Sequence, residues 1–188
     1  MGYQKYLKEL WQDHDKLKSI IRPRLIEWRK GNSVVRVEYP VRLDKAHRVG
    51  YKAKQGYVVV RVKLLRGGHM RPRISSGRKS KNTRRKLVLE MNYKWIAEQR
   101  ANKKYPNCEV VNSYFLAKDG RYYFFEVILI DREIGKKYPE ISGLASQRGR
   151  VYRGLTTSGK RSRSLLGKGK GYEKMRPSER ANRMRRKQ

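Results

Sequence analysis

The chain has 188 residues, and its 49 Lys and Arg residues against 16 Asp and Glu residues produce a formal net charge of +33 at pH 7. A mean hydropathy of −0.94 leaves too little apolar material to bury the whole chain, so we expect a core built from about two-thirds of the chain, plus extended basic arms. No apolar run approaches the roughly 18 residues of a membrane-spanning helix, and we expect no membrane partner. A net charge of this size predicts a polyanionic binding partner, and nucleic acid is the polyanion with the highest charge density.

The start of the chain and its cysteine content indicate where the protein is found. Residues 1–6 contain no apolar signal region, and Cys108 is the only cysteine. A single cysteine allows neither an internal disulfide nor a zinc site of the usual cysteine type. We therefore expect the protein to stay in the reducing cytoplasm in which it is made.

Two amphipathic helices are predicted at the start of the chain. Each has an apolar row at helical spacing. Pro23 should kink or restart the second helix, and Gly31 should end it. Trp11 and Trp28, the tryptophans of these two rows, are interpreted as core residues. The rows consist of Tyr3, Leu7, Leu10 and Trp11, and of Leu17, Ile21, Leu25 and Trp28.

Two strands are predicted next. Residues 34–39 alternate between apolar and polar, and Pro40 should close this strand at a sheet edge. Residues 57–65 form a stronger pattern, in which one face is apolar and the other carries Arg61 and Lys63. We expect the first face to enter the core and the second to present its cations.

A third helix is predicted from Leu87 onward, ending before Pro106, with Glu90 and Lys94 spaced for an ion pair on its surface. A β-hairpin follows, and it is the clearest local signal in the chain. Its strands cover residues 109–117 and 121–130, joined by a Lys-Asp-Gly turn. The second strand is apolar on both faces apart from Glu126, which predicts a central position in the sheet.

This order of elements predicts an α+β fold: a small mixed or antiparallel sheet with packed helices, plus long basic non-globular extensions. The charge follows the same division. Residues 41–86 carry sixteen Lys and Arg against one acid, and residues 141–188 carry fifteen against two, whereas residues 87–131 are balanced. From Gly143 onward the composition predicts no core. We expect a globular domain over residues 1–140 with an inserted basic loop at 66–86, and an extended basic arm over residues 141–188.

No catalytic or metal site is predicted. Residues 154–160 nearly match the phosphate-binding loop G-x-x-x-x-G-K-[ST], but Arg161 replaces the required hydroxyl and no apolar strand precedes Gly154. His14, His47 and His69 are too far apart in sequence for a local metal motif. The carboxylates are better explained by ion pairing than by catalysis. We expect no enzyme activity, no metal and no cofactor.

The basic segments carry the predicted nucleic-acid contacts. Tyrosines and glycines alternate with cations there, and such residues can stack on bases, bind phosphate and let the backbone approach closely. For residues 180–187 a disordered counterion tail is an equally good interpretation. The candidate contacts are the cations Arg42, Lys45, Arg48, Lys52, Lys54, Arg61, Lys63, Arg66, Arg148, Arg150, Arg153, Lys160, Arg161 and Arg163, and the stacking residues Tyr51, Tyr57 and Tyr152.

Several long blocks resemble one known family. Residues 47–62 read HRVGYKAKQGYVVVRV and are followed by Arg66-Gly67-Gly68; further blocks are VNSY at 111–114, FFEVILID at 124–131, RGLTTSGK at 153–160 and YLKELW at 6–11. These blocks closely resemble the archaeal and eukaryotic type of large-subunit ribosomal protein fifteen. The resemblance covers nearly the whole chain and is weakest at residues 70–84 and after Gly171. The chain looks more archaeal than eukaryotic.

The resemblance implies a structural constituent of the large ribosomal subunit, found in the cytoplasm and supporting translation. It implies that the basic extensions, including the arm at 141–188, bind and stabilise large-subunit rRNA. The implied partners are that rRNA and neighbouring large-subunit proteins, with no small-molecule substrate and no obligate homo-oligomer. Two other readings stay open. One is a DNA-compacting architectural protein, although no helix-turn-helix or zinc finger is found, and the other is an RNA-modifying or RNA-cleaving enzyme.

Overall fold

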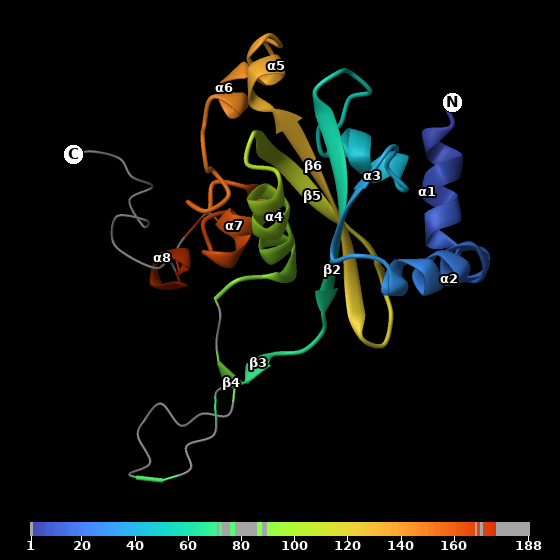
Figure 1. The fold of residues 1–188 in the computed structure, drawn as a ribbon, viewed down its shortest axis with the longest axis horizontal. Coiled ribbons are helices and arrows are strands. Elements are labelled where there is room, and N and C mark those ends of the chain that lie inside the picture. Colours follow the sequence, from blue (N-terminus) through green and yellow to red (C-terminus); the bar gives the residue numbers. More distant parts are fainter. Residues whose placement is uncertain are drawn as a thin grey trace.

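The computed structural model describes residues 2–70, 72, 76–77, 86–87, 90–167, 169 and 171–175. At its centre is an antiparallel four-stranded sheet in the order β1-β2-β6-β5 (Figure 1). The predicted α+β class is therefore confirmed, as are the edge position of β1 and the central position of β6. The strands are β1 (Val34–Val37), β2 (Tyr57–Leu65), β5 (Cys108–Lys118) and β6 (Tyr122–Asp131).

Helices α1 (Gln4–Gln12), α2 (His14–Lys30) and α3 (Leu43–Arg48) cover one face of the sheet (Figure 1). Of the two predicted effects of Pro23, a restart of the second helix is wrong, because α2 runs through this residue, and a kink stays a prediction. Pro23 is exposed there, and proline removes only one backbone hydrogen bond of the helix. Gly31 ends α2 as predicted, its N–H bonding to the carbonyl of Glu27. Helix α3 lies in a segment for which the sequence predicts no helix.

Helices α4 (Tyr93–Lys104) and α7 (Thr157–Ser162) cover the opposite face (Figure 1). Helix α4 begins later than predicted, after Asn92, whose side chain accepts a hydrogen bond from the N–H of Trp95. Glu90 has a φ of 54°, in the left-handed region that a right-handed helix cannot contain. The predicted surface pair of Glu90 and Lys94 on one helix is therefore wrong. The end before Pro106 is confirmed.

The remaining elements are short. Helices α5 (Arg132–Lys136) and α6 (Ser142–Ala145) pack together at one end of the sheet, and α8 (Tyr172–Met175) follows α7. Strands β3 (His69–Met70) and β4 (Lys86–Leu87) pair antiparallel in a separate two-stranded sheet. Most of the predicted inserted loop at 66–86 lies outside the described residues.

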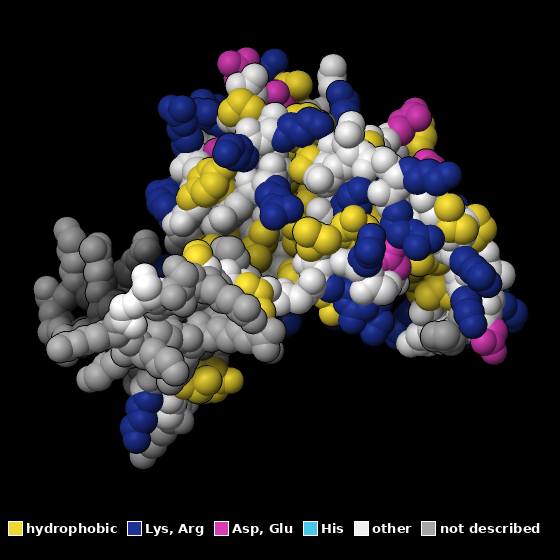
Figure 2. All heavy atoms as spheres, turned by 60° about the horizontal axis from the view of Figure 1, so that its bottom comes forward, with side chains coloured by type: hydrophobic (Ala, Val, Ile, Leu, Met, Phe, Trp, Pro, Cys, Tyr) yellow, Lys and Arg dark blue, Asp and Glu magenta, His cyan; other side chains and the backbone are white. Residues whose placement is uncertain are grey.

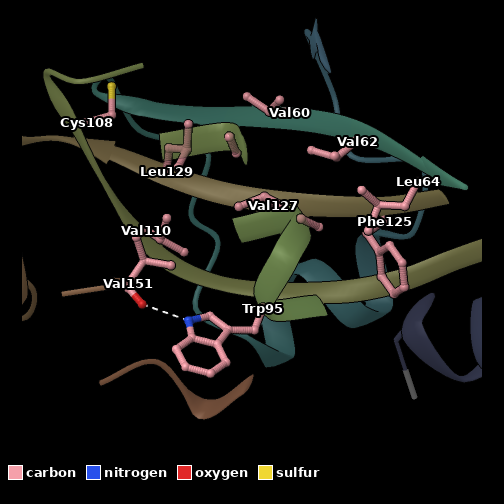
Figure 3. Packing of buried hydrophobic residues seen from close by; sticks show 12 residues of the cluster. Val60, Val62, Leu64, Trp95, Cys108, Val110, Phe125, Val127, Leu129 and Val151 are labelled. Atoms are coloured by element: carbon pink, nitrogen blue, oxygen red, sulfur yellow. Dashed lines mark hydrogen bonds between the residues drawn. The ribbon is translucent and has the colours of Figure 1, made fainter. Parts of the chain in front are cut away.

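The main core lies between the sheet and α4 (Figure 3). Trp95 points toward the C-terminal segment, the part of the chain that begins at residue 141. Its indole Nε1 donates a hydrogen bond there to the carbonyl oxygen of Val151 at 2.7 Å. Val151 and Ala145 are both fully buried, so the prediction that no core forms beyond Gly143 is wrong. Single apolar residues of this turn-rich segment pack against the sheet. Because they do not recur at a regular spacing, the sequence shows no periodic pattern there. The division of the chain at residue 141 stays a prediction.

A second core lies under α2, where Trp28 packs against Phe124 of β6 with ring centroids 5.5 Å apart. The cations of β2 lie at this core and are not simply presented to solvent. Arg61 stacks its guanidinium 4.6 Å from the Trp28 ring centroid, and Lys63 donates to the carbonyls of Arg29 and Gly31 at the end of α2. The prediction that this face presents its cations is corrected, because α2 covers the face and uses their charge and hydrogen bonds.

Glu126 is a fully buried carboxylate in the middle of β6. Its Oε1 accepts a hydrogen bond from the backbone N–H of Val41 at 3.2 Å, and its Oε2 accepts one from the hydroxyl of Tyr114. Burial raises the pKa of the Glu126 carboxyl, and the hydrogen bond from Tyr114 opposes this only in part. The pKa of the Tyr114 hydroxyl is also raised, by burial first and then by the carboxylate beside it. Glu126 thus ties the segment before α3 to the sheet.

This raised pKa predicts a pH-dependent stability. Above its ordinary value of 4.5 the unfolded chain releases the Glu126 proton while the folded chain retains it. The contribution of Glu126 to the free energy of unfolding is therefore full below pH 4.5 and is lost as the pH rises through the folded-state pKa, by at most about 1.4 kcal/mol per pH unit. Urea unfolding from pH 4 upward should show this decline relative to the variant Glu126→Gln.

A control separates this effect from the general titration of the protein. Glu140 is exposed, and its pKa is lowered by a hydrogen bond from Lys52, so its linkage to pH has the opposite sign. The variant Glu140→Gln should therefore keep the decline with pH that Glu126→Gln removes. Equal pH profiles for the wild-type protein and Glu126→Gln would contradict the assignment.

Candidate nucleic-acid interface

The predicted contact residues fall into two groups once the structure is known. Most of the cations have partners in the described part of the protein, and for the others this part shows none. The partnered cations are Arg42, Lys52, Lys54, Arg61, Lys63, Arg66, Arg150, Arg153 and Arg163. Among the described residues, no side-chain hydrogen bond or ion pair is found for Lys45, Arg48, Arg148, Lys160 and Arg161. We call these five residues the open cations.

Several partnered cations stabilise the fold directly. Arg66 donates to the carbonyl of Asp119 at 2.6 Å and lies over the Tyr123 ring, which holds the end of β2 to the β5–β6 turn. Arg61 is half-buried, and this burial lowers its pKa. A cation that stacks on a buried ring, as Arg61 does on Trp28, has little freedom to reach a phosphate. Such residues position the surface and leave contact to their neighbours.

Lys52 and Lys54 are different, because their partner is exposed. Both pair with Glu140, at 2.6 and 3.7 Å, and the hydrogen bond to this carboxylate raises the pKa of Lys52. Exposed ion pairs contribute little to stability, so a phosphate can replace Glu140 at small cost. Lys54 also lies 5.1 Å from the Tyr138 ring centroid. These two lysines stay candidates for contact.

The C-terminal segment is held to the body by buried polar groups. Glu98 of α4 accepts hydrogen bonds from Ser113 at 2.5 Å and from Ser158 at 2.8 Å, and so joins α4, β5 and α7. Glu109 accepts the N–H of Gly149 at 2.9 Å. Arg150 donates to the carbonyl of Val110 at 2.5 Å, and burial lowers its pKa. Arg150 therefore anchors this segment from within.

The segment that nearly matches a phosphate-binding loop has a packing role. Gly154 has a φ of +67°, and Gly159 lies so close to it that an added Cβ would meet the Gly154 Cα at 2.7 Å. Thr156 accepts a hydrogen bond from the N–H of Gly159 and so begins α7. The two glycines are needed where the backbone closes on itself. The spacing that suggests a nucleotide site is thus explained by a tight turn.

Tyr51, Tyr57 and Tyr152 are not equally available for stacking. Tyr51 and Tyr57 are partly buried and contact each other edge-on, with ring centroids 6.0 Å apart. Tyr51 also lies against His47 at 6.0 Å. Tyr152 is 53% exposed, so it is the most accessible ring of the three.

The open cations belong to elements that lie on the two faces of the sheet. Lys45 and Arg48 belong to α3, while Arg148, Lys160 and Arg161 belong to the C-terminal segment on the other side of the sheet (Figure 1). On the face seen in Figure 2, Lys and Arg side chains spread over the folded body, whereas acidic side chains are few and scattered. The part of the predicted arm beyond residue 175, which includes the tail at 180–187, lies outside the described residues.

Lys5 and Lys8 are two cations of a basic surface that are not among the predicted contacts. A groove of about 750 Å³ lies between α1 and α3, and Lys5 and Lys8 line it together with Arg42, Lys45 and Arg48. The signal was present in the sequence, because residues three apart share one side of a helix. The apolar row of α1 is the stronger pattern in this segment, and it carries no information about the polar side of the helix.

Neither metal binding nor membrane insertion is indicated by the described part of the chain. Its His, Cys, Asp and Glu side chains form no group of three or more that could hold a metal ion. None of the helices in this part is long and apolar enough to cross a bilayer.

Comparison with known proteins gives one consistent result. Residues 2–182 match the protein family described as Ribosomal L15. The chain is also 47% identical over 167 residues to the "Large ribosomal subunit protein eL15" of Picrophilus torridus, covering 86% of this chain and 85% of that relative. This agrees with the family indicated by the sequence blocks. The chain therefore belongs to the ribosomal L15 family and is a ribosomal protein, a structural component rather than an enzyme.

Proposed function

We propose that this protein is a structural constituent of the large ribosomal subunit, in the cytoplasm, where it binds and stabilises folded large-subunit rRNA and so supports translation. The observation that carries the proposal is the placement of the open cations. Helix α3, which carries Lys45 and Arg48, covers one face of the sheet, and α7, which carries Lys160 and Arg161, covers the other. A body with cations on two sides can neutralise two RNA segments at once and hold them at a defined separation.

The fold supports this role. The sheet and both cores form a rigid spacer, because buried Trp28 and Trp95 pack the helices on the two faces. The C-terminal segment at 141–188 binds RNA in this proposal, but its first part does so as a packed surface and not as a free arm. Neighbouring large-subunit proteins are the remaining partners, and neither a small-molecule substrate nor an obligate homo-oligomer is part of the proposal.

Sedimentation of a native lysate on sucrose gradients, at moderate and at high salt, tests the proposal. Mass spectrometry would follow this chain through the fractions. We expect it to migrate with the large subunit and to remain there after the high-salt wash, since many phosphate contacts and an ordered body act together. Recovery with chromosomal DNA would favour a DNA-compacting role, and recovery in free fractions would remove the structural role in the subunit.

A further inference from the structure

The groove between α1 and α3 has a strongly basic lining. Its volume is about 750 Å³, and Lys5, Lys8, Arg42, Lys45 and Arg48 all line it. Asp44 is the one carboxylate among the lining residues. It is already paired with Arg42, whose Nε and Nη2 lie 3.4 and 3.1 Å from its two oxygens. Five cations against this one carboxylate leave the lining of the groove with a strong net positive charge.

The floor of the groove is fixed in place. The guanidinium of Arg42 lies 4.2 Å from the ring centroid of Trp11 and is held on its other side by Asp44. Trp11 itself packs against the core under α2. Arg42 therefore shapes the groove and adds to its positive charge, and direct contact is left to the cations around it that have fewer partners.

The lysines on the α1 wall are held loosely by comparison. Lys5 is 4.0 Å from Glu9, and both side chains are more than half exposed, which makes the pair weak. Lys8 has no side-chain partner among the described residues. Both ammonium groups are free to turn into the groove.

Helix α1 is attached to the body mainly through partly buried side chains such as Trp11. None of its nine residues is buried, and a nine-residue helix is too short to be stable alone in water. Tyr3 and Tyr6 are 52% and 67% exposed. This partly exposed helix therefore carries one wall of the cationic groove.

We propose that the α1–α3 groove binds one strand of large-subunit rRNA through consecutive phosphates, with Lys5 and Lys8 contacting the phosphates from one wall and Lys45 and Arg48 from the other. This assignment rests on the proposed function and names where on the body a strand lies. Charge selects the occupant: five cations facing a single, already paired carboxylate match a polyanion, and a row of phosphates neutralises both walls at once.

The test is a pair of double variants with the same change in charge. Lys5→Gln/Lys8→Gln removes two cations from the groove, and Lys18→Gln/Lys30→Gln removes two exposed cations from the neighbouring α2 outside it. Filter binding to deproteinised large-subunit rRNA between about 50 and 200 mM KCl gives the slope of log affinity against log salt. The groove variant should lower this slope by about 1.4 to 1.8, and the control variant by less than half as much.

Each outcome has a separate meaning. Equal slopes for the two variants would overturn the groove assignment while leaving rRNA binding by the wild-type protein intact. Failure of the wild-type protein to bind rRNA would overturn the proposed function as well. If the groove variant binds rRNA normally but no longer enters the subunit, the occupant is an acidic protein segment and the assignment to RNA is wrong. The variant Lys5→Arg/Lys8→Arg, which keeps both charges, should bind as the wild type does, and equal circular-dichroism melts would exclude misfolding.

Discussion

Replacing Trp95 by Ala is expected to lower the free energy of unfolding by about 3–5 kcal/mol. Trp95 is only 8% exposed and belongs to the core between α4 and the sheet. Its loss leaves a cavity and also frees the carbonyl of Val151, to which the indole donates. A Cβ placed on Gly154 would lie 3.3 Å from its ring, so the same side chain also supports the turn before α7. Guanidinium unfolding followed by circular dichroism measures the change.

Two further variants identify the source of the effect. Trp95→Phe keeps most of the ring and loses the donor, and should cost about 1–3 kcal/mol because the Val151 carbonyl stays buried without its partner. Tyr152→Ala removes a neighbouring but exposed ring and should change the stability by about 0.5 kcal/mol or less. If Trp95→Ala is no more destabilising than Tyr152→Ala, the C-terminal segment is not packed on α4 as described.

Neutralising the open cations of the C-terminal segment is expected to have the largest effect on RNA binding. The variant Arg148→Gln/Lys160→Gln/Arg161→Gln removes three exposed charges that hold no part of the described fold together. If each contacts one phosphate, the slope of log affinity against log salt should fall by about 2.1 to 2.7. The affinity for deproteinised large-subunit rRNA should weaken with it, while the unfolding transition stays where it is.

A charge-matched control comes from the electrically balanced middle of the chain. The variant Arg100→Gln/Lys103→Gln/Lys118→Gln also removes three exposed cations, from α4 and from the end of β5. If only the total charge matters, the two triple variants will lower the slope equally, and the assignment of contacts to the C-terminal segment fails. If placement matters, as proposed, only the first variant will do so.

Local sequence patterns were sufficient to predict the helices and strands whose signal lies within a few neighbouring residues. The alternation in β2 predicted its bounds, and a strand that is apolar on both faces predicted the central place of β6, because only a strand with neighbours on both sides is buried on both faces. Asp119 in the predicted turn accepts the N–H groups of Arg121 and Tyr122, which is the reason Asp is favoured there. Helix ends at Gly31 and before Pro106 follow from the same local chemistry.

The tertiary structure decided which of the predicted contact residues are free. Arg61, Lys63 and Arg150 look in the sequence like any other cations. Only their partners, a buried tryptophan ring and backbone carbonyls distant in the chain, show that they hold the fold together. Lys5 and Lys8 show the reverse case, because their role in the groove depends on α3, which the sequence did not predict.

The sequence by itself determined the class of fold, the family and the two basic regions, since periodicity, conspicuous motif blocks and charge counts are properties of neighbouring residues. The tertiary structure alone decided that Ala145 and Val151 belong to the core and that Glu126 is buried at the centre of the sheet. The physical reason is that burial and pairing depend on which distant segments meet. A lone valine among glycines and arginines is placed in a core by long-range packing, which no local pattern records.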